Sequence, residues 1–335
     1  MEYTTLGKTG LKISRIGFGG IPIQKVDAAA TRVLMERLAQ RGVNFIDSAR
    51  GYTVSEAFLG EALHGLRDRF VIATKSMART KEAMEKDIEI SLGNFRTDYI
   101  DLYQIHNPSL ADIEKVIAPG GALEALEAAK AAGKIGHLGL TAHSTAVFER
   151  ALELDWVETI MFPYNIVETQ GEELMRRAHE KNVGVICMKP MAGGALEDAT
   201  LAIRFIRQND DVSVVIPGMY AEKEIDQNIE AMENTAPLTD KEIEKIETIR
   251  RELGTQFCRR CNYCQPCTAG INMSGIFVLE GYLLRYGLGD WAKGRYDAMA
   301  KKAGDCIGCG VCEERCPYQL PIREMLARCK AEFGA

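Results

Sequence analysis

The chain has 335 residues, of which 46% are hydrophobic and 26% charged, and its formal net charge is -6; it is long enough to bury a sizeable core, as one large α/β domain or as two domains. Lys and Arg are dispersed rather than gathered in a basic stripe, which argues against a nucleic-acid partner. No apolar run approaches the roughly 18 to 20 residues of a membrane span, and the first residues lack the pattern of a secretory signal, so we expect a cytoplasmic protein without a membrane partner.

Between about residue 13 and residue 234, short runs rich in β-forming residues alternate with amphipathic helical stretches. This alternation is typical of parallel strands joined by crossover helices. Strands are predicted at residues 13–19, 43–47, 70–75, 99–106, 137–142, 158–164, 184–190 and 212–217. Eight strand-helix units over about 220 residues favour an α/β fold of the TIM-barrel type, (β/α)8, with a doubly wound open sheet as the alternative.

One more helix is predicted at residues 238–253, where Thr239 and Glu242 have the spacing of a capping box. The helix is expected to end at Gly254. The composition of the chain changes after this residue, because every cysteine except Cys187 follows it. We therefore place a barrel domain at residues 1–254 and a small, mainly helical domain at residues 255–335.

Polar residues stand at the downstream ends of three predicted strands. Asp47 ends the second strand, Lys75 the third and His106 the fourth, and Tyr52 follows Asp47 in the next loop. Each of these residues alone has a plain structural explanation, such as a helix cap or a solvated tip. Because the carboxyl ends of barrel strands meet at one mouth, the combination predicts a shared site.

These four residue types are suited to proton transfer. A tyrosine hydroxyl is a poor acid near neutral pH, with a reference pKa of about 10, but a neighbouring ammonium stabilises the phenolate and lowers that pKa. A buried Lys75 would tend to lose its proton unless an anion kept it charged, and Asp47 can be that anion. His106 can orient a carbonyl oxygen beside the phenol of Tyr52 or share its proton.

At this point the sequence resembles the aldo-keto reductases. The family's second-strand signature is present as "NFIDSARGYTVSE", the third strand ends in "IATK", and the fourth reads "LYQIHNP". The resemblance covers roughly residues 1 to 250, and the opening "YTTLGKTGLKISRIGFGG" is similar to the family's N-terminal hairpin, which plugs the bottom of the barrel. It implies that Asp47, Tyr52, Lys75 and His106 form the catalytic tetrad, with Tyr52 as the general acid.

The resemblance also implies a nicotinamide cofactor across the mouth of the barrel. Thr141 and Asn165 fall close to the positions that hold the nicotinamide carboxamide. Met188 stands where an aromatic ring often stacks under the nicotinamide, and Met161 replaces a glutamine common nearby, although a core role suits both methionines equally well. The implied cofactor contacts are Gly20, Ile21, Asp47, Thr141, Asn165, Met188, Lys189, Pro190, Gly218, Gln227 and Asn228.

The form of the cofactor is implied by the segment after the last strand. Relatives that prefer the phosphorylated cofactor usually read Lys-Ser where this chain has Gly218–Met219. The arginine that grips the 2′-phosphate in those relatives falls at Glu224, whose carboxylate would repel a phosphate but could accept a hydrogen bond from a ribose hydroxyl. Lys223 next to it weakens this argument. The resemblance therefore implies NAD(H) or NADP(H), with NAD(H) favoured.

Two groups of four cysteines lie in the C-terminal part of the chain. The second group, Cys306, Cys309, Cys312 and Cys316, has the spacing C-x2-C-x2-C-x3-C followed by proline, by which bacterial ferredoxins hold 4Fe-4S clusters. The first group, Cys258, Cys261, Cys264 and Cys267, nearly repeats this spacing. Zinc is the alternative, because four thiolates from two C-x2-C pairs also suit that metal. Two such groups, one with the ferredoxin proline, favour iron.

In bacterial ferredoxins the fourth cysteine of each motif ligates the other cluster. This crossover predicts two 4Fe-4S clusters with exchanged fourth ligands. One would be held by Cys258, Cys261, Cys264 and Cys316, and the other by Cys306, Cys309, Cys312 and Cys267. Cys187 and Cys329 are left over, and both are predicted to be small buried hydrophobic residues.

The main functional hypothesis is an NAD(P)H-dependent aldo-keto reductase whose substrate is a small-molecule carbonyl compound or alcohol. A hydride carries two electrons whereas a 4Fe-4S cluster takes one at a time, so their direct exchange is chemically awkward without a flavin or radical step. The clusters are therefore expected to sense redox conditions or to transfer electrons, the latter with an electron-transfer partner protein. The alternative is a nicotinamide-responsive redox sensor or electron-transfer subunit with little carbonyl reductase turnover.

Overall fold

The computed structural model describes residues 1–254 and 256–334. The chain forms two compact units, and each is described by itself. The first contains Met1–Asn165, Thr169–Pro190 and Asp198–Pro237. The second contains Ile166–Glu168, Met191–Glu197 and most of the chain after Pro237. No helix in the described part of the chain is long and apolar enough to cross a membrane.

The first unit is built on an eight-stranded parallel sheet in which the strands follow one another in chain order. The prediction of eight strands is confirmed at every position. Their bounds are β3 (Phe18–Gly19), β4 (Phe45–Asp47), β5 (Val71–Ser76), β6 (Ile100–Ile105), β7 (Ile135–Thr141), β8 (Thr159–Pro163), β9 (Gly184–Met188) and β10 (Val214–Val215).

Bridges between the two edges of this sheet close it into a barrel. Ile16 pairs with Val215 and Gly19 with Gly218, both in parallel register, and the Gly17 amide donates to the Val215 carbonyl at 2.8 Å. The TIM-barrel prediction is therefore confirmed, and the open-sheet alternative is wrong.

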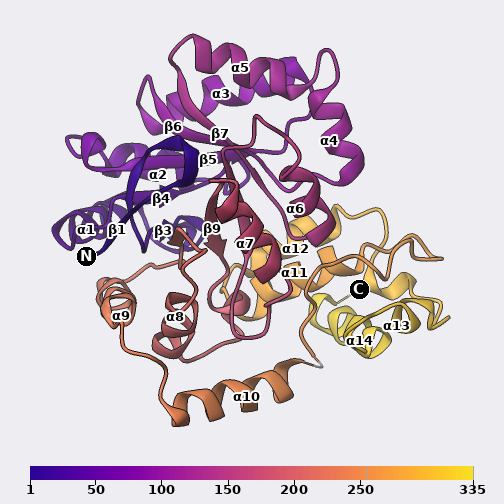
Figure 1. The fold of residues 1–335 in the computed structure, drawn as a ribbon. Helices are drawn as coiled ribbons and strands as arrows, with labels where there is room; N and C mark the ends of the chain where they lie inside the picture. The colour runs from indigo at the N-terminus through magenta and orange to yellow at the C-terminus, as the bar shows by residue number, and fades with distance from the viewer. Residues whose placement is uncertain (255, 335) are drawn as a thin grey trace. The chain divides into compact units, whose positions relative to one another are not determined.

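Helices follow the strands and lie outside the sheet (Figure 1). Side chains cap the N-termini of some of these helices: Asp27 accepts from the Ala30 amide at α1, and Asp198 accepts from the Leu201 amide at α8. The helices are α1 (Ala28–Gln40), α2 (Ser55–Ala62), α3 (Lys81–Phe95), α4 (Leu110–Ile117), α5 (Ala122–Ala131), α6 (Thr145–Ala151), α7 (Glu172–Glu180), α8 (Ala199–Arg207) and α9 (Glu222–Glu233), with short 3-10 turns at Gly7–Thr9, Ile21–Lys25 and Arg67–Arg69.

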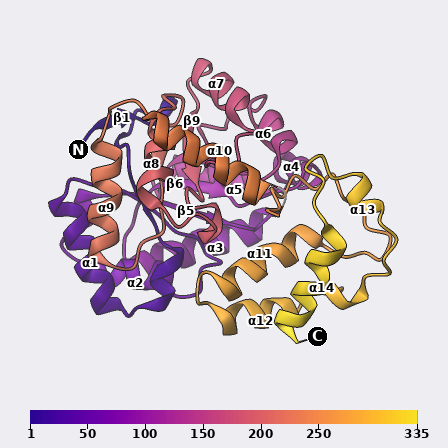
Figure 2. The same cartoon turned by 90° about the horizontal axis from the view of Figure 1, so that it is seen from below.

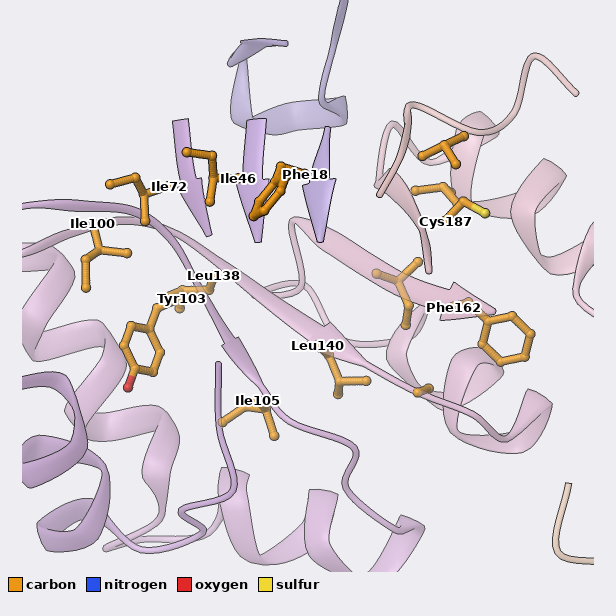
Figure 3. Packing of buried hydrophobic residues seen from close by; sticks show 14 of the residues in the cluster. Phe18, Ile46, Ile72, Ile100, Tyr103, Ile105, Leu138, Leu140, Phe162 and Cys187 are labelled. Carbon is orange, nitrogen blue, oxygen red and sulfur yellow. The ribbon is translucent and has the colours of Figure 1, made fainter. Parts of the chain in front are cut away.

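Strand residues alternate between two apolar cores. Outward-facing residues such as Phe18, Ile46 and Tyr103 pack between the strands and the surrounding helices (Figure 3). Inward-facing residues form a second, smaller core that includes Phe45, Leu102 and Ile186. This alternation follows from the two-residue period of side-chain direction along a strand.

An antiparallel hairpin precedes the barrel, made of β1 (Tyr3–Thr5) and β2 (Lys12–Ser14). Leu6 and Ile13 are completely buried and belong to the core inside the barrel. A Cβ atom added at Gly184 would lie 2.6 Å from Leu6 Cδ1, so a glycine is needed where the hairpin enters. The N-terminal hairpin implied by the family resemblance is therefore present.

The regular elements of the second unit are all helices in its described residues, and they are joined by loops. Its helices are α10 (Asp240–Gly254), α11 (Met273–Leu284), α12 (Gly289–Asp297), α13 (Val311–Glu314) and α14 (Ile322–Phe333), with 3-10 turns at Ala192–Gly194 and Ala303–Asp305. Figure 2 shows α11 packed against α12 and α14. The predicted capping box of α10 is confirmed, because the Thr239 amide donates to Glu242 at 2.8 Å and the Glu242 amide to Thr239 Oγ1 at 3.3 Å.

The second unit has a hydrophobic core of its own. Ile271, Ile276 and Leu326 are almost completely buried in it, and the rings of Tyr296 and Phe333 stack with their centroids 4.0 Å apart. The Tyr296 hydroxyl accepts a hydrogen bond from the Ala303 amide at 2.9 Å. A separate core allows this unit to hold its loops, including the cysteine motifs, independently of the barrel core.

Candidate active site and cysteine motifs

The four predicted catalytic residues all lie at the carboxyl ends of neighbouring barrel strands. Asp47 is the last residue of β4, Lys75 the penultimate residue of β5, and His106 comes directly after β6. Tyr52 lies in the loop between β4 and α2. The barrel therefore brings together side chains that are up to 59 residues apart in the sequence.

Asp47 and Lys75 form a buried ion pair at this edge. Lys75 Nζ lies 2.6 Å from Asp47 Oδ2, and both side chains are almost fully shielded from solvent. Lys75 also donates to the Ser48 carbonyl at 2.7 Å. Burial raises the pKa of the Asp47 carboxyl and lowers the pKa of Lys75, and in each case the partner's charge opposes the effect of burial.

The aromatic rings of Tyr52 and His106 stand beside this ion pair. Lys75 Nζ lies 4.9 Å from the centroid of the Tyr52 ring. The ring of His106 meets that of Tyr52 edge to face, with centroids 6.2 Å apart and an interplanar angle of 88°. A tyrosine near a cation and a histidine has the neighbours that a phenol needs to donate a proton near neutral pH.

The loop that carries Tyr52 is held by buried hydrogen bonds. Ser55 Oγ donates to the Gly20 carbonyl at 2.9 Å and lies 2.8 Å from Ser48 Oγ. The Arg50 amide donates to the Lys75 carbonyl at 3.0 Å, which ties the loop to the strand that carries the lysine. These contacts fix Tyr52 relative to Lys75.

Sequence reasoning missed Glu56, which supports the same loop. Only 2% of Glu56 is exposed. Its carboxylate accepts hydrogen bonds from Arg50, Thr74, Ser91 and Asn94 at 2.9, 2.8, 2.8 and 3.0 Å. A glutamate on the apolar face of the helix that follows the Tyr52 loop was the available signal, because a buried carboxylate requires several partners.

Several of the residues implied in nicotinamide binding lie at the ends of the following strands. Thr141 ends β7 and its Oγ1 accepts from the Asn107 amide at 2.9 Å. Asn165 is completely buried, and its Nδ2 donates to the Lys189 carbonyl at 3.0 Å. Met161 belongs to the core inside the barrel, and Met188 is partly exposed and packs against that core. Met161 therefore has the core role, whereas Met188 remains accessible.

The remaining implied contacts fall into two groups. Gly20 is buried beside Asp47, since a Cβ at Gly20 would lie 2.8 Å from the Asp47 carbonyl oxygen. Ile21 begins the adjoining 3-10 turn and is partly buried. Lys189 and Pro190 follow β9, where Lys189 has a left-handed backbone with φ of 56°. Gly218 is exposed and pairs with Gly19 in one of the bridges that close the barrel.

Helix α9 begins close to these residues and carries the implied adenine contacts. Asn228 is 5% exposed, and within residues 1–254 and 256–334 its buried Oδ1 has no hydrogen-bond partner. Gln227 is exposed, and its Nε2 donates to Thr200 Oγ1 at 3.3 Å. A buried oxygen without a partner needs a donor, and a bound cofactor with an amino group can supply one. This position fits the nicotinamide dinucleotides.

Glu224 occupies the N-terminus of α9. Its carboxylate accepts hydrogen bonds from the Tyr220 and Ala221 amides at 2.8 and 3.2 Å. Backbone amides at a helix N-terminus are a favoured binding place for anions. Here the protein's own carboxylate takes that place.

Comparison with known proteins identifies the family. The family model described as "Aldo/keto reductase family" matches residues 15–200 and 197–251. The chain belongs to the aldo-keto reductases. A second model, described as "4Fe-4S dicluster domain", matches residues 257–321 of the reductase. This match favours iron-sulfur chemistry over zinc for the cysteines.

Individual relatives of this aldo-keto reductase are distant but cover most of its barrel. L-galactose dehydrogenase from Arabidopsis thaliana is 26% identical over 69% of this chain and 88% of that protein. Aldo-keto reductase YhdN from Bacillus subtilis is 29% identical over 63% of this chain and 70% of that protein. Among solved structures, the holo form of aldo-keto reductase AKR11C1 from Bacillus halodurans superimposes with a TM-score of 0.65 at 26% identity, and covers 74% of this chain and 96% of that one.

Five cysteines of the reductase's second unit line one cavity. The cavity is lined by Cys306, Cys309 and Cys312 from the second motif together with Cys267 and Cys264 from the first. Cys261 and Cys316 are close enough to influence each other's charge. Cysteines of both motifs therefore lie together. Because Cys264, which the crossover assigns to the other cluster, lines the same cavity, the division of the ligands between two clusters stays a prediction.

The chemistry of this donor set fits 4Fe-4S clusters. Thiolates from several cysteines around one cavity are the ligands that such clusters use. In residues 1–254 and 256–334, no group of three or more His, Cys, Asp or Glu is arranged to hold a single metal ion. The two remaining cysteines, Cys187 and Cys329, are completely buried, as predicted.

Proposed function

We propose that this aldo-keto reductase transfers hydride between a nicotinamide cofactor and a small carbonyl compound or alcohol, with Tyr52 as general acid. The observation that supports this most directly is the grouping of Tyr52, Lys75 and His106 at one edge of the barrel, with 4.9 Å between Lys75 Nζ and the Tyr52 ring centroid. When bound, the nicotinamide supplies or accepts the hydride.

Each tetrad residue has a distinct task in this proposal. Tyr52 donates its hydroxyl proton to the carbonyl oxygen during reduction and recovers it in the reverse direction. Lys75 stabilises the phenolate that remains, and Asp47 keeps Lys75 charged inside the barrel by pairing with it at 2.6 Å. His106, edge to face with Tyr52, orients the carbonyl oxygen.

The cofactor in this proposal is held by the implied residues from Gly20 to Asn228, and NAD(H) is preferred over NADP(H). The support for this preference is Glu224, whose carboxylate binds the Tyr220 and Ala221 amides. A 2′-phosphate near this helix N-terminus would meet a negative charge where it requires donors.

The second unit binds two 4Fe-4S clusters in this proposal, with the crossed ligand sets described above. They serve electron transfer or redox sensing, and transfer would require an electron-carrying partner protein. The proposal keeps the domain boundary at residue 254, between family matches that end at residue 251 and begin at residue 257. The compact units divide earlier, at Pro237, because α10 is grouped with the second unit. Cysteines that hold clusters must stay reduced, which favours the cytoplasm.

Tyr52→Phe tests the catalytic proposal. The variant, purified anaerobically, is assayed against aldehydes, ketones, sugars and hydroxysteroids with NADH and NADPH; sugars are included because one relative is an L-galactose dehydrogenase. We expect turnover to fall about 10²- to 10⁴-fold, which is the usual contribution of a general acid. Cofactor binding, followed by fluorescence, should be unchanged. Tyr3→Phe, at a tyrosine of the N-terminal hairpin that is 41% exposed, is the matched control.

Two outcomes would contradict the proposal. Unchanged turnover in Tyr52→Phe would refute the assigned acid. If the wild-type protein binds cofactor and reduces no carbonyl compound, but its reduced clusters pass electrons to a carrier, the redox-subunit alternative is correct.

A further inference from the structure

A row of polar residues crosses the inside of the barrel next to the tetrad. Lys75 on β5 lies opposite Gln104 on β6, Gln104 opposite Gly139 on β7, and Gly139 opposite Thr159 on β8. Gln104 and Thr159 are both completely buried. The neighbouring interior positions are apolar, so this polar row requires an explanation.

Gln104 contacts the carboxylate oxygen of Asp47 that is not paired with Lys75. Lys75 Nζ lies 2.6 Å from Asp47 Oδ2, whereas Gln104 Nε2 donates to Asp47 Oδ1 at 3.4 Å. The carboxylate is thus held at both oxygens, from two different strands. A carboxylate fixed in this way keeps one oxygen directed at the lysine.

We propose that Gln104 is a positioning residue of the reductase, which holds the Asp47 carboxylate in its ion pair with Lys75 and is itself oriented by Thr159. This inference rests on the proposed function, because it concerns the same tetrad. Gln104 acts only through Asp47 and touches neither substrate nor cofactor in this role.

The other end of the Gln104 amide shows why Thr159 is involved. Gln104 Oε1 and Thr159 Oγ1 are both buried, and neither has a hydrogen-bond partner within the described residues. Both side chains flank Gly139, because a Cβ added at Gly139 would lie 2.2 Å from Thr159 Oγ1 and 3.1 Å from Gln104 Cγ. In this proposal the Thr159 hydroxyl supplies the donor that Gln104 Oε1 requires.

In the proposal, this pairing with Thr159 fixes the direction of the Gln104 amide. If the amide turned by half a rotation, Gln104 Oε1 would face the Asp47 carboxylate, and two acceptors would repel each other. With Oε1 engaged on the Thr159 side, the Nε2 donor must face Asp47. Gly139 makes room for the arrangement, since any Cβ there would displace Thr159.

The charged and titratable groups around the pair determine the expected pH effect. Asp47 faces Lys75, and Tyr52 and His106 lie beside that lysine. Glu56 also acts on Lys75 through its charge. The hydrogen bond from Gln104 lowers the pKa of Asp47 against the effect of burial, so its loss moves protonation of Asp47 to higher pH.

The test compares the pH dependence of kcat for wild type, Gln104→Leu and Thr159→Val. We expect kcat of Gln104→Leu to fall about tenfold at neutral pH, in proportion to the loss of a hydrogen bond to a charged group. The acidic limb of its pH profile should move to higher pH, while cofactor affinity stays unchanged. Thr159→Val should move the limb in the same direction by a smaller amount.

A matched control separates positioning from a loss of folded protein. Ser14 is buried, and its hydroxyl donates to the Ile16 carbonyl and accepts from the Asn44 amide, just before the start of β4 and at the opposite end of that strand from Asp47. Ser14→Ala therefore removes buried hydrogen bonds without moving the acidic limb. A Gln104→Leu profile that superimposes on wild type would overturn the inference. Tyr52→Phe is assayed in parallel: if it stays active, the proposed function fails, whereas an inactive Tyr52→Phe with a normal Gln104→Leu refutes only the positioning role.

Discussion

Glu168 and Arg260 form an ion pair within the second unit in which neither charge reaches solvent, since the side chains are 0% and 8% exposed. Arg260 lies between Cys258 and Cys261 of the first cysteine motif. Arg260 also donates to the Cys258 carbonyl at 3.2 Å. The pair therefore secures the backbone of a segment that carries two proposed cluster ligands.

Removal of the Glu168 charge should destabilise the second unit. Glu168→Gln leaves Arg260 buried without a counter-charge, which typically costs about 3–5 kcal/mol. The chain has two tryptophans, Trp156 and Trp291. In a Trp156→Phe background, the fluorescence of Trp291 reports urea unfolding of the second unit alone.

Asp297→Asn is the control for this measurement. Asp297 pairs with Lys302 at the surface of the second unit, where it is 70% exposed, so its loss should change stability by less than about 1 kcal/mol. Equal unfolding midpoints for the Glu168 and Asp297 variants would show that the buried pair contributes no more than a surface pair.

Glu158 should make the barrel sensitive to acid. Burial opposes ionisation of Glu158, but hydrogen bonds from His137 and Lys130 outweigh it and lower the pKa of the carboxyl. A depressed pKa in the folded state stabilises the protein above the unfolded value of about 4.3 and loses this contribution as pH falls through the folded pKa. Glu158→Gln should therefore cost more stability at pH 7 than at pH 3.5, as measured by urea unfolding at both values. An equal loss of unfolding free energy at both pH values would contradict this prediction. Glu153→Gln, at a 58% exposed carboxylate, is the control.

Neutralising Glu224 should weaken discrimination against NADPH. A charge at a helix N-terminus is worth about 0.3–1 kcal/mol at the surface, so Glu224→Gln should raise the ratio of kcat/KM for NADPH to that for NADH by roughly two- to fivefold. Glu230→Gln, at an exposed carboxylate in the last turn of α9, should leave the ratio unchanged. If both variants retain the wild-type ratio, Glu224 does not determine the preference between NADH and NADPH.

Single cysteine substitutions should reveal the crossed ligation. Wild-type protein should contain about eight iron atoms per chain, and Cys267→Ser and Cys309→Ser should each contain about four. Reductive titrations followed by electron paramagnetic resonance should show that the same cluster is missing from both variants. Cys264→Ser should lose the other cluster. Cys187→Ser, at a buried cysteine outside the motifs, should keep all the iron. Loss of different clusters in Cys267→Ser and Cys309→Ser would contradict the crossover, and zinc without sulfide would exclude clusters altogether.

Much of the fold could be predicted from the order of the amino acids. The eight strands were recognisable because buried parallel strands and amphipathic helices leave different periods in the chain. The positions of Asp47, Lys75 and His106 at strand ends followed from those strands, and the iron-sulfur domain from cysteine spacing. Their catalytic and ligand roles remain predictions.

Other features have no local signature. Arg260 and Glu168 are 92 residues apart, and the sequence around either residue does not predict that the two form an ion pair. The row from Lys75 through Gln104 to Thr159 exists only because the strands meet in one particular register. Local periodicity and motif spacing depend on residues that are close together in the sequence, so they can be predicted from the sequence. Side-chain partners across a closed barrel depend on strand register and close packing, which only the folded chain establishes.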